Sequence, residues 1–469
     1  MDEINVPQNK PINPRRRKRS KMQVIKEDYL PLVISGLAVI LVIIFIIGSI
    51  VRGIQGIQYR KRMEAEAALA AQQAQEQLET EAARILEEAK ALAVHFDYSG
   101  AVELIRSFSG QLSDFPELKE KYNEYQAAEQ TLVLWEDPAE ILSLSLQVLI
   151  ADPQRAFTNA NLGISYNRNF LTTGEFQKIL QQLYANDYIL IRTTDIYENG
   201  TMKSLYLPEG KKPLLLTQTN VNYYTYMVDG DGDKLPDKDG AGFASRLAID
   251  ANGFITCEIV NADGTTSTGP YDLVPILESF IETHPDFSFK GARAVLAVSG
   301  YDGIFGYRTS PAAKEYLGET QHAQEVEGAT RIVGMLRELG YELACYTYEN
   351  EPYGDYTAGQ ISQEMVKWDD EITPILGATD LFVFSRNSDI GPAGVAYDDE
   401  RFDLIYSYGY TTFLGFSTTN EGWCFANDDY FRMGRIILSG SSLAHHGLWF
   451  EGILDPSAIL DPTRGEIPG

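Results

Sequence analysis

The clearest feature of the hydrophobic pattern is a run of 23 residues without a charge, from Tyr29 to Val51. At about 1.5 Å per residue, a helix of this length crosses a hydrocarbon core of about 30 Å, so the run predicts a transmembrane helix. A buried helix of a soluble protein is the alternative, but such helices usually keep a polar face. A cleaved signal peptide fits less well, because the run is too long and no small-residue cleavage site follows it.

Basic residues flank this run unevenly. Seven Lys and Arg residues lie between positions 15 and 26, whereas four lie between positions 52 and 62. The positive-inside rule therefore places the N-terminus in the cytoplasm. A basic run can also mark a nucleic-acid patch, but beside a membrane span we favour a role in topology and lipid contact. We expect a single-pass protein of the cell membrane, with residues 29–51 in the lipid bilayer and an extracellular body.

The segment after the span has the pattern of a helical stalk. Residues 60–96 are rich in Ala, Glu and Gln and contain neither Gly nor Pro, which favours a long helix. The sequence 97–100 (DYSG) breaks that helix, and residues 101–108 and 116–134 predict further helical turns. One helical-hairpin repeat of the tetratricopeptide kind is an alternative interpretation, but a single unit is a weak match. We interpret residues 52–135 as a spacer.

From about residue 140, short apolar runs alternate with helical segments. The predicted strands are 141–150, 188–193, 213–217, 292–299, 341–346, 380–384, 411–416 and 435–438, and the predicted helices are 173–186, 272–284, 324–339, 359–374 and 400–408. Repeated β-then-α order with strands this apolar predicts an α/β fold with a parallel sheet covered by helices. Seven or eight such units favour a (β/α) barrel over an open sheet.

One segment breaks this rhythm. Residues 243–249 and 254–260 flank the turn sequence DANG (250–253), which is a β-hairpin signal. We therefore expect a hairpin insertion at 228–268. The predicted organisation is a basic cytoplasmic tail (1–28), a transmembrane helix (29–51), a helical stalk (52–135), a distorted barrel (140–455) and a C-terminal tail (456–469).

Charge divides the chain at the membrane span. Residues 1–62 carry 12 basic and 4 acidic side chains, which leaves 27 basic and 62 acidic side chains, a net charge of −35, for residues 63–469. Such a body repels phosphates, which argues against nucleic acid as a partner. Three cysteines, far apart in the sequence, exclude a disulfide-rich scaffold and a multi-cysteine zinc module.

Two stretches carry a resemblance to a known family. The sequences KKPLLLTQTNVNYYTYM (211–227) and TGPYDLVPILESFIETHPDFSFKGARAVLAVSGYDGIFGYRT (268–309) resemble the polysaccharide deacetylase family, in particular a membrane-anchored branch from Gram-positive anaerobes. The resemblance covers about residues 140–450. It implies a distorted (β/α) barrel with a glycan-binding groove at the carboxyl ends of the strands. It also implies removal of acetyl groups from glycans by a divalent metal, usually zinc, held by one Asp and two His.

The family's catalytic motifs are degenerate in this chain. Thr219 stands where the resemblance places the catalytic base, and Asn220 stands where it places the Asp ligand of the metal. Tyr346 and Asn350 occupy the two histidine positions of the His-x-x-x-His motif, and only His445 matches the final Leu-x-His pattern. A Thr hydroxyl is no base near neutral pH, and an amide oxygen is an uncharged, poor metal ligand. We therefore do not expect a catalytic zinc and favour a pseudoenzyme.

Two further groups of residues are candidates for binding. Tyrosines gather where the barrel loops are expected, and Tyr223, Tyr224, Tyr301, Tyr307 and Tyr348 are the candidates for stacking on sugar rings. Packing within a large domain is the alternative interpretation for these side chains. The acidic loop at 229–240 matches the spacing of calcium loops, with Asp229, Asp231, Asp233 and Asp237 as candidate ligands. The alternative is a solvated acidic turn.

Three functions remain open on the sequence. The first is an anchored, non-catalytic protein that binds a cell-wall or other envelope glycan. The second is an active carbohydrate deacetylase or esterase with an atypical site, although the chain has no G-x-S-x-G nucleophile elbow. The third is a scaffold for other envelope proteins. Positions 219, 220, 346 and 350 discriminate between the first two functions.

Overall fold

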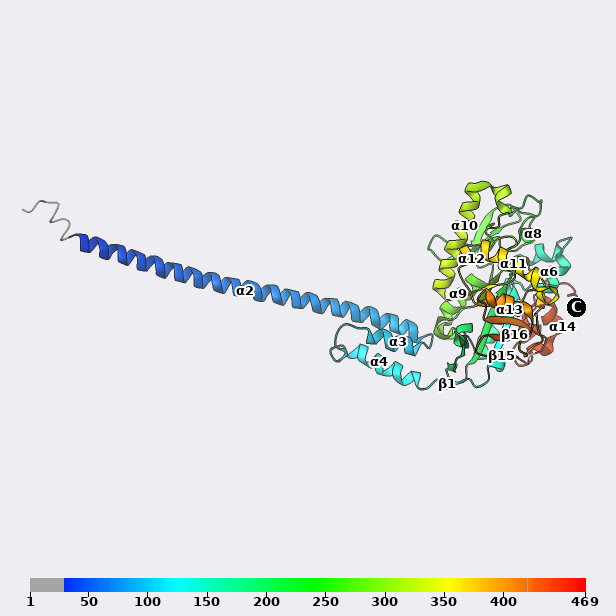
Figure 1. Cartoon of the computed structure of the whole chain (residues 1–469), viewed down its shortest axis with the longest axis horizontal. Coiled ribbons are helices and arrows are strands. Elements are labelled where there is room, and N and C mark those ends of the chain that lie inside the picture. Colours follow the sequence, from blue (N-terminus) through cyan, green and yellow to red (C-terminus); the bar gives the residue numbers. More distant parts are fainter. Residues whose placement is uncertain (1–28, 420) are drawn as a thin grey trace, which may run out of the picture. The chain divides into compact units, whose positions relative to one another are not determined.

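The computed structural model describes residues 29–419 and 421–469, so the basic tail predicted at 1–28 lies outside the described residues. Its first element is α2 (Leu30–Ala93), a single helix of 64 residues that contains the uncharged run except for its first residue, Tyr29. Among the described residues it is the one helix long and apolar enough to cross a membrane, and the side chains of its apolar window are exposed. This helix is compatible with a single-pass anchor (Figure 1).

The chain divides into two compact units, residues 1–81 and residues 82–469. In the second unit, the end of α2 buries Ile85 and Ala89 beside α3 (Tyr98–Arg106) and α4 (Pro116–Glu129). The predicted helix break is present at Asp97, whose side chain caps α3 by accepting from the Gly100 N–H at 3.1 Å. The helices that the sequence predicts for the stalk are therefore present, but the last one ends at Glu129, and Val133–Leu134, predicted as helical, form the strand β1.

Seven parallel strands form a closed ring. In order around the ring they are β11 (Val295–Val298), β12 (Glu342–Cys345), β13 (Leu381–Val383), β14 (Thr412–Ser417), β16 (Phe431–Ile437), β2 (Leu142–Gln147) and β7 (Lys212–Thr219), and β7 pairs with β11 to close it. An eighth strand, β3 (Tyr188–Leu190), pairs only with the start of β7. The predicted (β/α) barrel is confirmed. It is distorted because β3 lies outside the ring, which closes with seven strands.

Helices lie around the outside of this ring (Figure 1). They are α5 (Pro153–Thr158), α6 (Gly163–Asn169), α7 (Thr173–Ala185), α9 (Leu273–Thr283), α10 (Ala313–Leu339), α11 (Ala358–Glu371), α12 (Thr373–Leu376), α13 (Glu400–Ser407), α14 (Gly440–His445) and α15 (Pro456–Ile459). The insertion holds the predicted hairpin, β8 (Arg246–Ile249) and β9 (Ile255–Val260), and a third antiparallel strand that the sequence did not predict, β10 (Thr266–Gly269).

Alternate side chains along a barrel strand point inward or outward. Outward residues such as Leu214, Leu216 and Phe382 pack with the helices in one large core. Leu215 and Val383 belong to a second core inside the ring. Because Thr217 and Thr219 share the parity of Leu215, the polar end of β7 is aimed into the mouth of the barrel.

The C-terminal segment packs against the barrel. Arg464 is buried and forms an ion pair with the buried Glu175 of α7, at 2.6 Å between Nε and Oε1. Its guanidinium also donates to the backbone oxygens of Asn167 and Phe170, each at 2.7 Å. Residues 456–469 are therefore tied to α6 and α7, beside the mouth.

Candidate functional site

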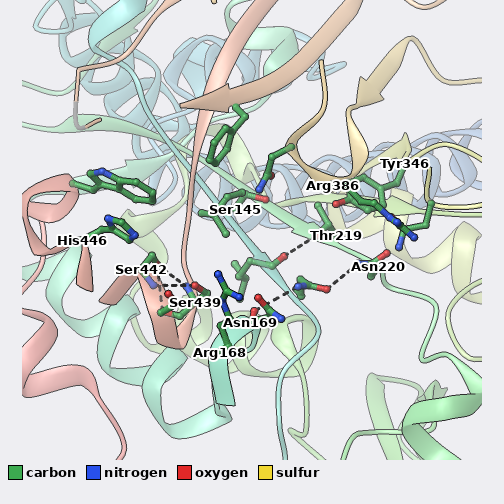
Figure 2. A pocket seen from close by; sticks show the side chains of 18 residues that line it. Ser145, Arg168, Asn169, Thr219, Asn220, Tyr346, Arg386, Ser439, Ser442 and His446 are labelled. Atoms are coloured by element: carbon green, nitrogen blue, oxygen red, sulfur yellow. Dashed lines mark hydrogen bonds between the residues drawn. The ribbon is translucent and has the colours of Figure 1, made fainter. Parts of the chain in front are cut away.

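A pocket of about 400 Å³ lies at the carboxyl ends of the barrel strands. Its walls are Ser145, Leu146, Gln147, Arg168, Asn169, Thr219, Asn220, Tyr346, Asn350, Arg386, Asn387, Phe416, Ile437, Ser439, Ser441, Ser442, His446 and Trp449 (Figure 2). Most of the polar side chains are amides and hydroxyls. The position is the one at which barrel proteins place their functional residues, because loops from several strands converge there.

All four degenerate motif positions line this one pocket. Thr219 ends β7 and Asn220 follows it, while Tyr346 and Asn350 lie in the segment after β12. The two segments are 127 residues apart between Thr219 and Tyr346, and the parallel pairing of β7, β11 and β12 brings their ends to the same rim. The resemblance therefore identified positions that are neighbours in space.

Amide and hydroxyl groups form a network at the position of the first motif. The Asn220 amide donates to Gln147 Oε1 at 2.9 Å, and its oxygen accepts from the Tyr224 hydroxyl, also at 2.9 Å. Tyr224 also shares a hydrogen bond of 2.7 Å with Ser299 Oγ. The Thr219 hydroxyl donates to the Leu146 carbonyl at 3.3 Å. Both motif side chains thus have hydrogen-bond partners within the protein.

These residues do not fit a catalytic zinc site. Such a site needs three good protein ligands, most often imidazole, thiolate or carboxylate groups. The described residues that line the pocket include no Asp, Glu or Cys, and His446 is their one imidazole. The Asn220 oxygen already accepts a hydrogen bond, so the donor set offers neither the charge nor the ligands that the metal requires.

The pocket has a positive character. Arg168 at the end of α6 and Arg386 after β13 are exposed at its mouth. A third arginine, Arg435 of β16, is fully buried one layer below, where Nη1 donates to Ser145 Oγ at 2.9 Å. Its other hydrogen bonds go to the carbonyls of Gly415 and Phe384. Burial lowers the pKa of Arg435 to about 10, which leaves it charged near neutral pH.

Strained backbone surrounds the pocket. Four lining residues that are not glycine have left-handed φ values: 57° for Asn220 and for Asn350, 48° for Arg386 and 56° for Asn387. Such conformations cost energy and gather at functional sites, where the surrounding structure fixes them. The buried Asn222 amide provides one such constraint, because it donates to the carbonyls of Ser299 and Gly303 at 2.6 and 2.5 Å.

The histidine expected from the Leu-x-His pattern is displaced by one position. His445 is exposed, and its Nε2 lies 2.8 Å from the Ile467 carbonyl, outside the pocket lining. His446 lines the pocket instead, stacked on Trp449 with ring centroids 4.2 Å apart and an interplanar angle of 12°. Trp449, His446 and Arg168 were not predicted from the sequence, because they come from short helices and loops that carry no motif.

Most of the tyrosines proposed for sugar stacking are buried. Tyr223, Tyr224 and Tyr348 are 1%, 3% and 7% exposed, so their rings offer little surface to a glycan in this structure. Their hydroxyls bind Asp272, Asn220 and Glu371, respectively, which shows a packing role. Tyr301 is exposed but does not line the pocket, and Tyr307 packs against Arg246. Aromatic surface at the pocket comes from Tyr346, Phe416 and Trp449 instead.

The acidic loop gathers part of the predicted calcium ligand set. Carboxylate oxygens of Asp229, Asp231 and Asp237 lie within 4.8 Å of one another. Asp233 lies outside this group, and its carboxylate accepts from the Leu235 N–H at 2.8 Å. The Asp237 carboxylate also accepts from the N–H groups of Gly230 and Asp231. Calcium binding remains a prediction, with three carboxylates in place of four.

Comparisons with known proteins add little to this description. No family model matches the chain, and no curated protein matches it. A solved structure, the Streptococcus pyogenes deacetylase PplD in complex with acetate, is similar over 67% of this chain and 98% of that chain, with 14% sequence identity and a TM-score of 0.32. A likeness at this level carries no argument about the reaction, and the barrel assignment rests on the strand pairing itself.

Proposed function

We propose that this protein is a membrane-anchored, extracytoplasmic glycan-binding protein, built on a deacetylase-like barrel that no longer catalyses deacetylation. One observation carries the proposal. The four positions at which the resemblance places a base and three metal ligands meet in one pocket, where they are Thr219, Asn220, Tyr346 and Asn350. The barrel mouth therefore keeps a site and lacks the groups that the reaction requires.

The lining of the pocket suits a saccharide. Sugar rings present hydroxyls at their edges and C–H groups on their faces, so they bind to sites that combine amides, hydroxyls and aromatic rings. Trp449 and Phe416 supply aromatic surface, and Asn169 and Ser441 are among the polar side chains. The buried Asn350 Oδ1 has no hydrogen-bond donor within the part of the chain that the structure describes.

Hydrolysis of an acetamide needs a base for the attacking water and a group that stabilises the developing oxyanion. The hydroxyl of Thr219 is only 3% exposed and donates to a backbone carbonyl, so it is neither basic nor free. Asn220 is held by Gln147 and Tyr224. We therefore expect binding without release of acetate.

Binding and turnover can be tested together on the full-length protein in nanodiscs of phosphatidylcholine. We expect measurable binding of chitooligosaccharides or peptidoglycan fragments by isothermal titration, and no acetate release above a protein-free control. The variant Trp449→Leu keeps apolar volume but removes the aromatic face, which should weaken binding by about fivefold, corresponding to ~1 kcal/mol. Phe254→Ala, at a side chain 70% exposed and outside the pocket, is the matched control.

Two outcomes would contradict the proposal. Acetate release that disappears in Asn220→Ala would mean that the pocket is an active site of an unrecognised kind. Absence of binding to every envelope glycan tested would remove the function altogether. A restoration variant addresses the geometry: it carries Thr219→Asp, Asn220→Asp, Tyr346→His and Asn350→His. Stoichiometric zinc binding by this variant, and none by the parent, would support loss of the ligands alone.

A further inference from the structure

We propose that the ligand of this pocket is an acidic saccharide, whose carboxylate or phosphate group is held by Arg168 and Arg386 at the barrel mouth. This inference rests on the proposed function and specifies its substrate class. The shared chemistry is an oxyanion on a sugar, because a guanidinium group binds the planar edge of a carboxylate or two oxygens of a phosphate in the same bidentate manner.

The first support is the contrast between the pocket and its surroundings. Residues 63–469 carry 62 acidic and 27 basic side chains, yet no described residue that lines the pocket is acidic. Two of the lining residues are arginines. An anionic ligand is attracted to this positive site and repelled by the negative surface around it.

The second support is the state of these two arginines. Thirteen arginines lie between residues 140 and 469. Eleven of them form ion pairs or side-chain hydrogen bonds, as Arg246 does with Glu325 and Arg401 with Asp399. Of the thirteen, Arg168 and Arg386 are the two whose guanidinium groups have neither kind of partner among the described residues, and both line the pocket. Each therefore keeps five N–H donors for a ligand.

Their placement suits a ligand held from more than one direction. Arg168 comes from α6 and Arg386 comes from the turn after β13, so different elements of the barrel deliver the two charges. Figure 2 shows Arg386 beside Tyr346 on one side of the pocket and His446 on the opposite side, with Arg168 and Asn169 at a third place on the rim. An acidic group on a sugar can thus bind an arginine while the ring meets the amides and Trp449.

The third support lies beneath the pocket. Arg435 is 1% exposed, and its guanidinium has no carboxylate within ion-pair distance among the described residues. A buried charge without a counter-ion is costly, and the cost falls when an opposite charge approaches through a medium of low dielectric constant. Ser145 separates this guanidinium from the pocket, because it accepts from Arg435 and lines the wall. A bound oxyanion would offset the buried charge.

The test uses the full-length protein in nanodiscs of phosphatidylcholine, whose headgroups carry no net charge. Three probes are titrated: trigalacturonate, the same trisaccharide with its carboxylates reduced to hydroxymethyl groups, and a hexose phosphate. We expect trigalacturonate or the hexose phosphate to bind at least tenfold more tightly than the reduced trisaccharide. The preferred acidic probe identifies the carboxylate or the phosphate as the recognised group, and either preference supports the proposal.

Matched variants assign the effect to the two arginines. Arg168→Gln and Arg386→Gln should each reduce the affinity for the acidic probe by about tenfold, as expected for loss of one charge-assisted contact, and reduce the affinity for the neutral probe much less. Arg331→Gln, at an exposed arginine of α10 outside the pocket, is the control and should change neither. Because both pocket side chains are exposed, the melting temperature should stay that of the parent.

The outcomes separate this inference from the proposed function. Equal binding of the acidic and reduced trisaccharides, with both arginine variants unchanged, would overturn the inference and leave neutral glycan binding in place. Binding of no saccharide would overturn both. An equal loss in Arg331→Gln would also overturn the inference, because the preference would then reflect the general charge of the body.

Discussion

The buried carboxylate of Asp272 gives a prediction that depends on pH. Asp272 precedes α9 and is fully buried, with no cationic partner among the described residues. It accepts hydrogen bonds from the Leu149 N–H at 2.9 Å, from Gln218 Nε2 at 2.6 Å and from the Tyr223 hydroxyl at 2.5 Å. This one side chain therefore connects the loop after β2, the end of β7 and the loop that follows Asn220.

Burial raises the pKa of Asp272 to about 6, and the hydrogen bonds from Tyr223, Leu149 and Gln218 only partly oppose this. In the unfolded chain the pKa of an Asp is about 3.9. A difference of about 2 units corresponds to ~3 kcal/mol of unfolding free energy. Because the folded-state value is the higher one, this stabilisation is complete below about pH 4 and is lost as the pH rises through about 6.

The variant Asp272→Asn removes the titration but keeps the shape of the side chain. At pH 4 the parent carboxyl group is protonated and has one O–H donor, whereas the amide has two N–H donors, one of which stays unpaired in this buried site. We therefore expect the variant to be less stable than the parent at pH 4. That deficit should shrink by ~3 kcal/mol by pH 7. Urea unfolding of the full-length protein in non-ionic micelles, followed by tryptophan fluorescence at each pH, measures both free energies.

The comparison between the two proteins isolates this carboxyl group from all others that titrate in the same range. Asp187→Asn removes an exposed carboxylate and serves as the matched control. If the unfolding free energies of the parent and of Asp272→Asn differ by the same amount at pH 4 and at pH 7, burial does not raise the pKa of Asp272. If the variant's loss of stability grows with pH, folding lowers the pKa of Asp272 and does not raise it.

Two further predictions concern the calcium loop and the membrane anchor. The parent should bind calcium with a Kd in the ~10⁻⁴–10⁻³ M range, and Asp229→Asn combined with Asp231→Asn should abolish the heat of calcium binding in isothermal titration. The control Asp263→Asn, in another exposed turn, should keep that heat. Identical heats in all three proteins would mean that the loop is a solvated acidic turn. Protease added to intact protoplasts should remove the body and leave a short N-terminal fragment, and a fully protected body would contradict an extracellular location.

The architecture was largely predictable because burial leaves a strong trace in the sequence. Each of the eight predicted strands corresponds to a strand of the parallel sheet, since a strand covered on both sides carries a continuous apolar run, as residues 213–216 do. The exclusion of β3 from the ring has no such trace. The exclusion follows from the parallel pairing of β7 with β11, for example of Thr217 with Val295, because this pairing closes the ring without β3. Such a pairing joins two strands that are distant in the sequence.

The candidate site was predictable where the resemblance aligns it with the ends of two predicted strands. That resemblance placed Thr219 and Asn220 at the end of β7, and Tyr346 and Asn350 after β12. The tyrosines after β7 were misplaced, because a Tyr is equally suited to a sugar-binding surface and to a core with a partner for its hydroxyl, as Tyr224 has in Ser299. Trp449 lies in a short 3₁₀ segment after β16, whose direction depends on tertiary packing and not on any local pattern.

The strained residues of the mouth bear on whether the pocket still has a function. Left-handed φ values at Asn220, Asn350, Arg386 and Asn387 cost about 1–3 kcal/mol each in general, and such strain persists only where the surroundings enforce it. Here hydrogen bonds enforce it: the Thr347 hydroxyl donates to Ser385 Oγ and accepts from the Glu351 N–H, which joins the turns that carry Asn350 and Arg386. A rim fixed in this way loses little conformational entropy when a ligand binds, so its affinity depends on the contacts themselves. This rigidity of the rim supports the proposal that the mouth of the barrel binds a ligand, although its residues do not fit the metal.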